Sequence, residues 1–579
     1  MKNSIVLLIL LIMLIYVSLG SILTSSLYES KRIVYRAYLP LLAVKEDNTG
    51  TVINVTIEAY YPGRGSIDYV VEDGIIYKDT EYSVEYSLVL ASIITGYDYR
   101  FLDYKVIFPK GTRIEGTSAT LGFLLLFTYM LSGKNYDSMI GATGLVAPNL
   151  IVGNVSGLRE KYEAAMSYGL GFVVGPVYPG GSDLEHYYEA VDVLHALKLI
   201  GYRDFAIYTS QIHIDQPRYM IETFKKSYNS FIDNITKILS HVPVGTRYLY
   251  FNDAIETMNK SKTYAELGRW YVAASFAFNA YIKTIYGYLK YENDNIVSLV
   301  IDWIKGNQSL FKGNLHGLIN RIGSLKAFDV VLNAYDRYRY SEILLDEALN
   351  TSDSDDQYML LATSLARIHT ARHWLYMVSE RDLAESWNTS ALSKSFFEEY
   401  IDTSFKYLAS MNYIDKFLFN MYMNASSRDN ITRIFEYGFL MYLVNFYMMQ
   451  LRPIIFPLSK NMTIIREFND TLKTLFLLLA LRTGSISPSV LTSFSITSAL
   501  LHENESLESI GFILSDALSK VVIELSLYSS LRAPPLVSGI LNNKVVLHNI
   551  DATVHLYVAL LITGLGCFVL GYGIGRIRY

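Results

Sequence analysis

The chain has 579 residues, which exceeds the usual size of one compact domain and predicts two or three domains. Its formal net charge of −5 includes no block of basic residues, so the sequence indicates no nucleic-acid partner. The single cysteine, Cys567, excludes an intramolecular disulfide, a cysteine-based metal site and a cysteine nucleophile in the body of the chain.

The chain begins with a hydrophobic segment. Residues 4–27 carry no charge and follow Lys2, a pattern typical of a signal peptide or of an uncleaved signal anchor. We assign one of these two roles to residues 1–27, and the small residues around Gly20 are compatible with cleavage there.

Residues 33–211 combine short β-type runs with helical stretches, which predicts an α+β domain. Strands are expected at 52–59, 104–108 and 172–176. A helix is expected at 120–131, where the segment is too short to cross a bilayer and too apolar for a surface. We therefore expect this helix to lie inside the core of the domain.

Residues 212–545 are expected to form an all-α domain. No proline occurs between Pro243 and Pro453, and so long a gap favours long helices. Apolar residues at helical spacing predict helices at 264–291 and 356–381 within a bundle or stacked helix pairs. No repeat has a dependable period, so a solenoid remains only an alternative. Two polar segments are expected to be loops: residues 350–356 and 483–497.

A second hydrophobic segment lies near the C-terminus. Residues 554–575 are apolar apart from His555 and are followed by Arg576 and Arg578. This pattern predicts a transmembrane helix with a cytoplasmic tail. We therefore expect a protein of the cell membrane, anchored by its C-terminal helix, whose main body is extracytoplasmic.

The distribution of glycosylation acceptors favours the same placement. About four Asn-x-Ser/Thr acceptors would arise by chance in a chain of this composition, and a larger number indicates exposure to the glycosylation machinery. A chance excess remains the alternative. The acceptors open at Asn54, Asn154, Asn234, Asn259, Asn307, Asn350, Asn388, Asn424, Asn430, Asn461, Asn469 and Asn504.

One serine stands where a nucleophile would be stabilised. A glycine-containing turn at 115–118 leads Ser118 to the start of the apolar helix expected at 120–131. Free backbone N–H groups and the helix dipole at such an N-terminus stabilise the negative charge of a tetrahedral intermediate.

A serine nucleophile needs a base, and no histidine precedes His186. Lys161 is the candidate base, on a helix that Ser156 would cap and Gly169 would end. A lysine acts as a general base only when it is neutral, and burial favours the neutral form. On these residues alone, a solvated surface lysine and a serine that only caps its helix are the simpler interpretation.

Several segments in order resemble one family. Residues 115–119, Glu-Gly-Thr-Ser-Ala, resemble the Gly-x-Ser-Ala nucleophile motif of Lon-type serine peptidase domains, closest to the archaeal membrane-anchored type. Residues 143–149 resemble the family's Thr-Gly segment and hairpin, and 157–165 resemble the helix that carries its catalytic lysine. The segments 80–95 and 172–179 resemble its first helix and a later strand, so the likeness covers about residues 36–210.

The resemblance implies a role for each matching residue. Ser118 would be the nucleophile and Lys161 the general base of a Ser-Lys dyad, with Thr143 as a hydroxyl neighbour that orients Lys161. The backbone N–H groups of Thr117, Ser118 and Ala119 would form the oxyanion hole. The implied fold is the α+β Lon peptidase domain, and the implied reaction is peptide hydrolysis through an acyl-enzyme, without a cofactor or metal.

The sequence contains no phosphate-binding loop, because its only Gly-Lys pair, Gly133-Lys134, is followed by Asn135. The ATPase module of many Lon enzymes is therefore missing, and we expect ATP-independent activity on unfolded or flexible extracytoplasmic proteins. His369 and His373 lie four residues apart on an expected helix, but no third metal ligand is evident, so a surface or packing role is favoured over metal binding.

These observations predict a membrane-anchored serine endopeptidase whose helical domain handles protein or peptide substrates or assembles a homo-oligomer. The alternative is a catalytically inactive Lon-like fold that serves as a cell-surface binding or structural scaffold. The two hypotheses differ in one geometric requirement. An enzyme needs Lys161 buried and its amine close to the Ser118 hydroxyl.

Overall fold

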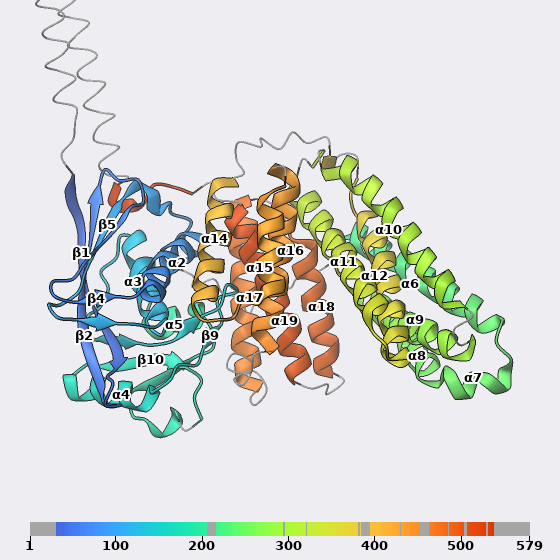
Figure 1. Cartoon of the computed structure of the whole chain (residues 1–579), viewed down its shortest axis with the longest axis horizontal. Helices are drawn as coiled ribbons and strands as arrows, with labels where there is room; N and C mark the ends of the chain where they lie inside the picture. Colours follow the sequence, from blue (N-terminus) through green and yellow to red (C-terminus); the bar gives the residue numbers. More distant parts are fainter. Residues whose placement is uncertain are drawn as a thin grey trace, which may run out of the picture.

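The computed structural model describes residues 31–537, except 180, 205–215, 293–295, 320, 323, 380–381, 384–393, 429, 451–461, 484–485, 503–506 and 528–530. The expected N-terminal segment 1–27, the expected span 554–575 and Cys567 lie outside the described residues. Within the described part, no helix is both long and apolar enough to cross a bilayer. A mixed α/β region is followed by an all-helical region, as the sequence predicts (Figure 1).

The α/β region is built on a seven-stranded sheet in the order β11-β10-β7-β1-β2-β5-β3. The pairs β1–β2 and β2–β5 are antiparallel, whereas β3–β5, β1–β7, β7–β10 and β10–β11 are parallel. The strands are β1 (Arg32–Val44), β2 (Gly50–Tyr61), β3 (Ile67–Val70), β4 (Ile75–Ile76), β5 (Asp103–Ile107), β6 (Arg113–Ile114), β7 (Ile140–Ala142), β8 (Leu145–Val146), β9 (Val152–Gly153), β10 (Phe172–Pro176) and β11 (Tyr187–Ala190). The helices of this region are α2 (Lys78–Thr95), α3 (Thr120–Leu131), α4 (Leu158–Tyr168) and α5 (Val193–Leu199).

Side-chain alternation along β1 places α3 and α4 on opposite faces of the sheet. Leu39 and Leu41 belong to the large hydrophobic core that contains α3, whereas Leu42 packs in a separate cluster with Leu158 of α4. Successive residues of a strand point to opposite faces, so this division follows from the pleat. The helix α3 is buried along nearly its whole length, as its composition predicts.

The elements expected in the α/β region are confirmed. The strands expected at 52–59, 104–108 and 172–176 correspond to β2, β5 and β10, and α3 has the expected bounds. The helix expected at residues 80–95 is α2, which begins two residues earlier than expected.

The helical region is divided in Figure 1 between the helices α6–α12 and the helices α14–α19, which lie between that group and the α/β region. Its helices are α6 (Arg218–Ser240), α7 (Val244–Tyr250), α8 (Asn252–Glu266), α9 (Trp270–Glu292), α10 (Val297–Ile319), α11 (Leu325–Asn350), α12 (Ser354–Leu375), α14 (Lys394–Ser410), α15 (Lys416–Ser426), α16 (Asn430–Gln450), α17 (Met462–Thr483), α18 (Pro488–His502) and α19 (Leu507–Leu527). The boundary expected at residues 211 and 212 falls outside the described residues, between α5 and α6.

Two expectations for the helical region are wrong in part. The helix expected at 264–291 is interrupted at Gly268, whose left-handed φ of 71° separates α8 from α9. The loop expected at 483–497 is largely the helix α18, which begins at Pro488. Proline is favoured in the first turn of a helix, and the hydroxyls of Thr492 and Ser493 donate to the carbonyl of Ser489 inside it. The loop expected at 350–356 is confirmed in part, because α11 ends at Asn350 and α12 begins at Ser354.

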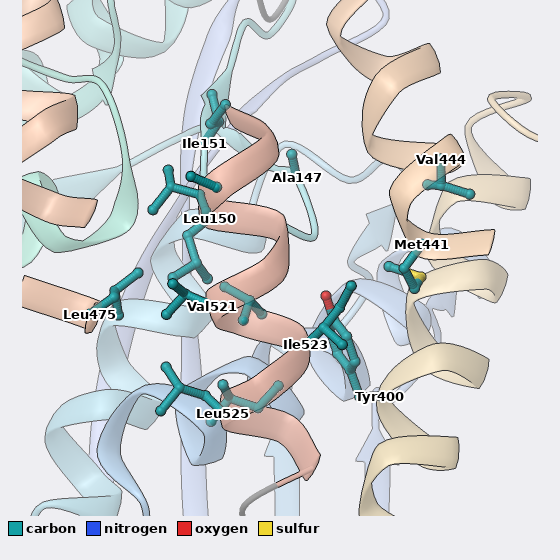
Figure 2. Close-up of a cluster of buried hydrophobic side chains, with 14 of the residues drawn as sticks. Ala147, Leu150, Ile151, Tyr400, Met441, Val444, Leu475, Val521, Ile523 and Leu525 are labelled. Atoms are coloured by element: carbon teal, nitrogen blue, oxygen red, sulfur yellow. The ribbon is translucent and has the colours of Figure 1, made fainter. Parts of the chain in front are cut away.

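The α/β and helical regions share one hydrophobic core. Leu150 and Ile151, which precede β9, lie beside Val521 of α19, with residues of α14, α16 and α17 around them (Figure 2). Tyr400 of α14 donates a hydrogen bond to the carbonyl of Pro148 at 3.0 Å. The sequence predicts both regions but not this interface between them.

Candidate active site

Ser118 lies immediately before α3, at the end of the turn that leads out of β6. Its side chain is partly exposed, whereas Thr117 and Ala119 on either side are buried. Gly116 has a φ of 107°, and a Cβ added to it would meet no atom within 4 Å. The glycine therefore serves the backbone conformation of the turn, because the space beside it would admit a side chain.

The turn that precedes Ser118 is held by the N-terminus of α2. The Gly116 N–H donates to Asp79 Oδ2 at 2.6 Å, and the Thr80 hydroxyl donates to the Gly116 carbonyl at 3.3 Å. Ser87, two turns further along α2, donates to the carbonyl of Thr120 at 3.0 Å inside the core. These contacts fix the direction in which the serine leaves the turn, and sequence analysis assigned Asp79 no role.

Lys161 is carried by the second turn of α4. The expected cap at Ser156 is wrong, because Gly157 occupies the N-cap with a φ of 61° and no side chain caps the helix. The Lys161 N–H donates to the Gly157 carbonyl at 3.0 Å. The helix ends at Gly169, with a φ of 91°, as expected.

The structure brings the Lys161 amine to 2.8 Å from the Ser118 hydroxyl oxygen, with the amine donating. Lys161 is 3% exposed. Burial lowers its pKa from the usual 10.5 to about 8, because desolvation disfavours the charged ammonium. About a tenth of the amine is then neutral at pH 7 and about half at pH 8. The pair therefore has the geometry and the protonation that a serine–lysine dyad requires.

Thr143 lies next to Ser118 at the end of β7, with a hydrogen-bond partner different from the one expected. Its hydroxyl donates to the backbone carbonyl of Ser118 at 3.2 Å, and the Gly144 N–H donates to the same carbonyl at 2.8 Å. The hydrogen bond of Thr143 therefore orients the peptide of Ser118 rather than the amine of Lys161. The sequence places this threonine at the site but not its acceptor.

Three backbone N–H groups before α3 have no acceptor among the described residues. Among the described residues, no acceptor bonds the N–H groups of Thr117, Ser118 or Ala119, whereas the Thr120 and Leu121 N–H groups bond to the carbonyls of Thr117 and Gly144. The free N–H groups lie at the positive end of the α3 dipole. They can donate to a carbonyl oxygen that gains negative charge next to the Ser118 hydroxyl.

The helical region supplies part of the wall of this site. The buried Tyr407 of α14 stacks on Tyr86 of α2, with ring centroids 4.4 Å apart. Its hydroxyl accepts hydrogen bonds from the Thr120 hydroxyl at 3.2 Å and the Val146 N–H at 3.3 Å. Thr117 donates to the Met411 sulfur at 3.1 Å. Sequence analysis missed both Tyr407 and Met411, since nothing local to α14 relates it to residues 117–120.

The hairpin expected after Thr143 is formed by β8 and β9. Its turn includes Leu150 in the left-handed region, with a φ of 70°, although leucine is disfavoured there. The Leu150 side chain is fully buried against the helical region, so packing offsets the backbone cost (Figure 2). The hairpin thereby positions the chain where it enters α4, the helix that carries Lys161.

The two histidines considered as metal ligands pack against aromatic rings. His369 stacks on Tyr281 with centroids 5.6 Å apart, and His373 contacts Phe231 edge-on at 5.0 Å. No group of three or more potential ligands occurs among the described residues. Among the described residues, the Ser118–Lys161 pair is the arrangement with the clearest chemistry.

No family model matches the chain, and no curated protein is significantly similar to it in sequence.

Proposed function

We propose that the protein is a serine endopeptidase that uses Ser118 as nucleophile and Lys161 as general base. The observation that carries the proposal is the buried Lys161 amine, 2.8 Å from the Ser118 hydroxyl oxygen and with its pKa lowered to about 8. A buried lysine without a counter-ion costs stability, so a purely structural role gives no reason to retain it. The cost of burying Lys161 therefore favours an enzyme over an inactive scaffold with the same fold.

The proposed reaction begins when the neutral Lys161 amine accepts the proton of the Ser118 hydroxyl. The serine oxygen attacks the carbonyl carbon of a peptide bond, and the free N–H groups of Thr117, Ser118 and Ala119 stabilise the oxyanion. The Lys161 ammonium then returns its proton to the departing amine, which leaves an acyl-enzyme on Ser118. A water molecule, deprotonated by Lys161, hydrolyses the ester and restores the dyad.

Two hydrophobic segments, near the two ends of the chain, support the proposed location of the protein. The segments 1–27 and 554–575 support a membrane anchor with an extracytoplasmic body, and the absence of a phosphate-binding loop supports activity without ATP. A peptidase without an ATP-driven unfolding module acts on unfolded or flexible proteins and peptides. The resemblance of residues 36–210 to Lon-type peptidase domains supports the same class of reaction.

The direct test is hydrolysis of an unfolded protein, such as labelled casein, by the purified full-length chain without ATP. Ser118→Ala and Lys161→Ala should each lower the rate by at least about a thousandfold, since the two groups act as a unit. A control is Ser156→Ala, because this serine precedes α4 without capping it. Equal hydrolysis by the native chain and both dyad variants would refute the assignment.

A second measurement identifies the nucleophile itself. Incubation with a slowly deacylated ester should add the acyl group to the peptide containing Ser118, detected by mass spectrometry. The label should be absent from Ser118→Ala. An acyl group found on another residue would overturn the proposed role of Ser118 even if hydrolysis were observed.

A further inference from the structure

A cavity of about 240 Å³ lies in the helical region among α6, α9, α11 and α12. Two arginines, Arg337 of α11 and Arg367 of α12, line it together with His373. Among the described residues, no aspartate or glutamate lines the cavity. It is therefore a concave site with fixed positive charge, separate from the Ser118–Lys161 pair.

Neither guanidinium group forms an ion pair within the described part of the chain, although Asp336 beside Arg337 interacts with it electrostatically. The Arg367 side chain has no hydrogen-bond acceptor among the described residues, and its Nε is buried. Arg337 donates only to the backbone carbonyl and side-chain oxygen of Asn333. Burial lowers the pKa of Arg337 and Arg367 lowers it further, whereas Tyr271 and Asp336 raise it in part. Two neighbouring cations without an ion pair among the described residues are costly, and a bound anion would relieve that cost.

The surrounding groups neutralise this charge only in part. Burial raises the pKa of Asp336, which precedes Arg337 on the same helix, to about 7 although Lys520 and Arg337 act to lower it, and its Oδ1 has no hydrogen-bond partner among the described residues. Burial lowers the pKa of His373 to about 3, so its ring is neutral. The buried Nδ1 of His373 also has no partner among the described residues and offers one further polar contact.

The rest of the lining is largely aromatic. Arg337 lies over the ring of Trp374, 4.6 Å from its centroid, and Arg367 lies over Phe278 at 5.3 Å. These stacking contacts hold each guanidinium plane and leave its edges available to an acceptor. Further aromatic side chains in the lining are Phe224, Phe231 and Tyr271. Such a lining suits an apolar group and disfavours a small, strongly hydrated ion.

We propose that this cavity binds a carboxylate attached to an apolar or aromatic group, with Arg367 and Arg337 as the carboxylate ligands. The planar guanidinium edge matches the two oxygens of a carboxylate. A volume of about 240 Å³ is below the range of about 300–1,000 Å³ typical of drug-sized ligands, so the site holds one residue-sized group. The carboxyl terminus of a peptide and a free aromatic acid share this chemistry. The inference does not depend on the dyad.

The test is isothermal titration calorimetry on the full-length chain with four probes. The probes are N-acetyl-phenylalanine, the tripeptide Ala-Ala-Phe, and the C-terminal amide of each. We expect the acids to bind at least tenfold more tightly than their amides. Tight binding of the tripeptide acid assigns the site to peptide carboxyl termini, whereas binding of N-acetyl-phenylalanine alone assigns it to a free acid.

The variant Arg367→Gln should weaken binding of the acids at least tenfold and should lower the melting temperature only slightly. Among the described residues its side chain makes no hydrogen bond or ion pair and loses only its stacking on Phe278 and Tyr340. The matched control is Arg372→Gln on the same helix, since Arg372 bonds to Asn307 and does not line the cavity. It should change the affinity less than twofold. The inference is overturned if acid and amide bind equally, or if no probe binds with a Kd below about 1 mM. It is also overturned if inorganic phosphate competes as well as the acids, or if both variants weaken binding alike.

Discussion

Replacing Lys161 with methionine should abolish hydrolysis and at the same time stabilise the α/β region. The pKa of Lys161 falls from the usual 10.5 to about 8 through burial. A lysine whose pKa is depressed on folding destabilises the folded state fully below its folded pKa, and the penalty fades as the pH rises from 8 towards 10.5. Methionine has a similar length and no charge, so it removes the penalty while filling the same space.

The size of the effect follows from the two pKa values. Linkage gives a penalty of about 3 kcal/mol at pH 7 and about 2 kcal/mol at pH 9. Loss of the hydrogen bond between Lys161 and Ser118 offsets about 1 kcal/mol of the gain. We therefore expect Lys161→Met to be more stable than the native chain by about 2 kcal/mol at pH 7 and about 1 kcal/mol at pH 9.

Hydrogen-exchange mass spectrometry of the slowest amides in α4 and β10 measures this difference locally. Tryptophan fluorescence would not, because every tryptophan of the chain lies at or beyond Trp270, outside the α/β region. The control is Lys45→Met, an exposed lysine next to β1, which should change stability by less than about 0.5 kcal/mol. A Lys161→Met variant that is less stable than the native chain, or a difference that is the same at both pH values, would refute the reasoning.

Three further predictions concern the same site. The kcat/KM for peptide hydrolysis should rise with pH to a plateau above about 9, because Lys161 must lose a proton with a pKa of about 8 to act as a base. A profile that is flat between pH 6 and 9, a range that extends about one to two units on either side of this pKa, would contradict the prediction. Gly50→Ala should lower kcat about a hundredfold or more, because the new Cβ would lie 1.9 Å from a backbone carbonyl oxygen of α4 and would push that helix and its lysine away. Gly171→Ala, where an added Cβ meets only ordinary contacts, is its control, and equal rates for the two variants would show that the position of α4 does not matter. Tyr407→Phe should destabilise the chain by about 1–3 kcal/mol and lower kcat with little change in KM, because a buried N–H group and a hydroxyl lose their acceptor. Tyr86→Phe, which removes a buried hydroxyl without a partner, should be neutral or stabilising in the same thermal melts and assays.

Local patterns in the sequence determined much of the α/β region. The apolar run at 120–131 fixed the bounds of α3, and β-type runs located β2, β5 and β10. The order of the motifs around Ser118 and Lys161 selected these two residues from many serines and lysines. Each of these features is local, because helix and strand periods and turn residues act over a few neighbouring positions.

Some local expectations were wrong because tertiary contacts outweighed composition. The serine- and threonine-rich stretch at 483–497 was expected to be a loop, yet α18 buries several of its hydroxyls, and Ser487 at its start donates to Glu524 of α19 at 2.8 Å. Likewise, Gly157 rather than Ser156 is the N-cap of α4, since the chain entering this helix takes a left-handed backbone at that position.

Only the tertiary structure decided how the site is completed. Asp79 holds the nucleophile turn, Thr143 bonds to the Ser118 carbonyl, and Tyr407 reaches the site from the helical region. Arg337 and Arg367, which form no ion pair among the described residues, line one cavity because α11 and α12 pack side by side. Hydrophobic patterning shows which face of an element is buried but not which distant element covers it. The sequence alone thus determined the elements and the two central residues, and packing between remote segments decided their burial, partners and protonation.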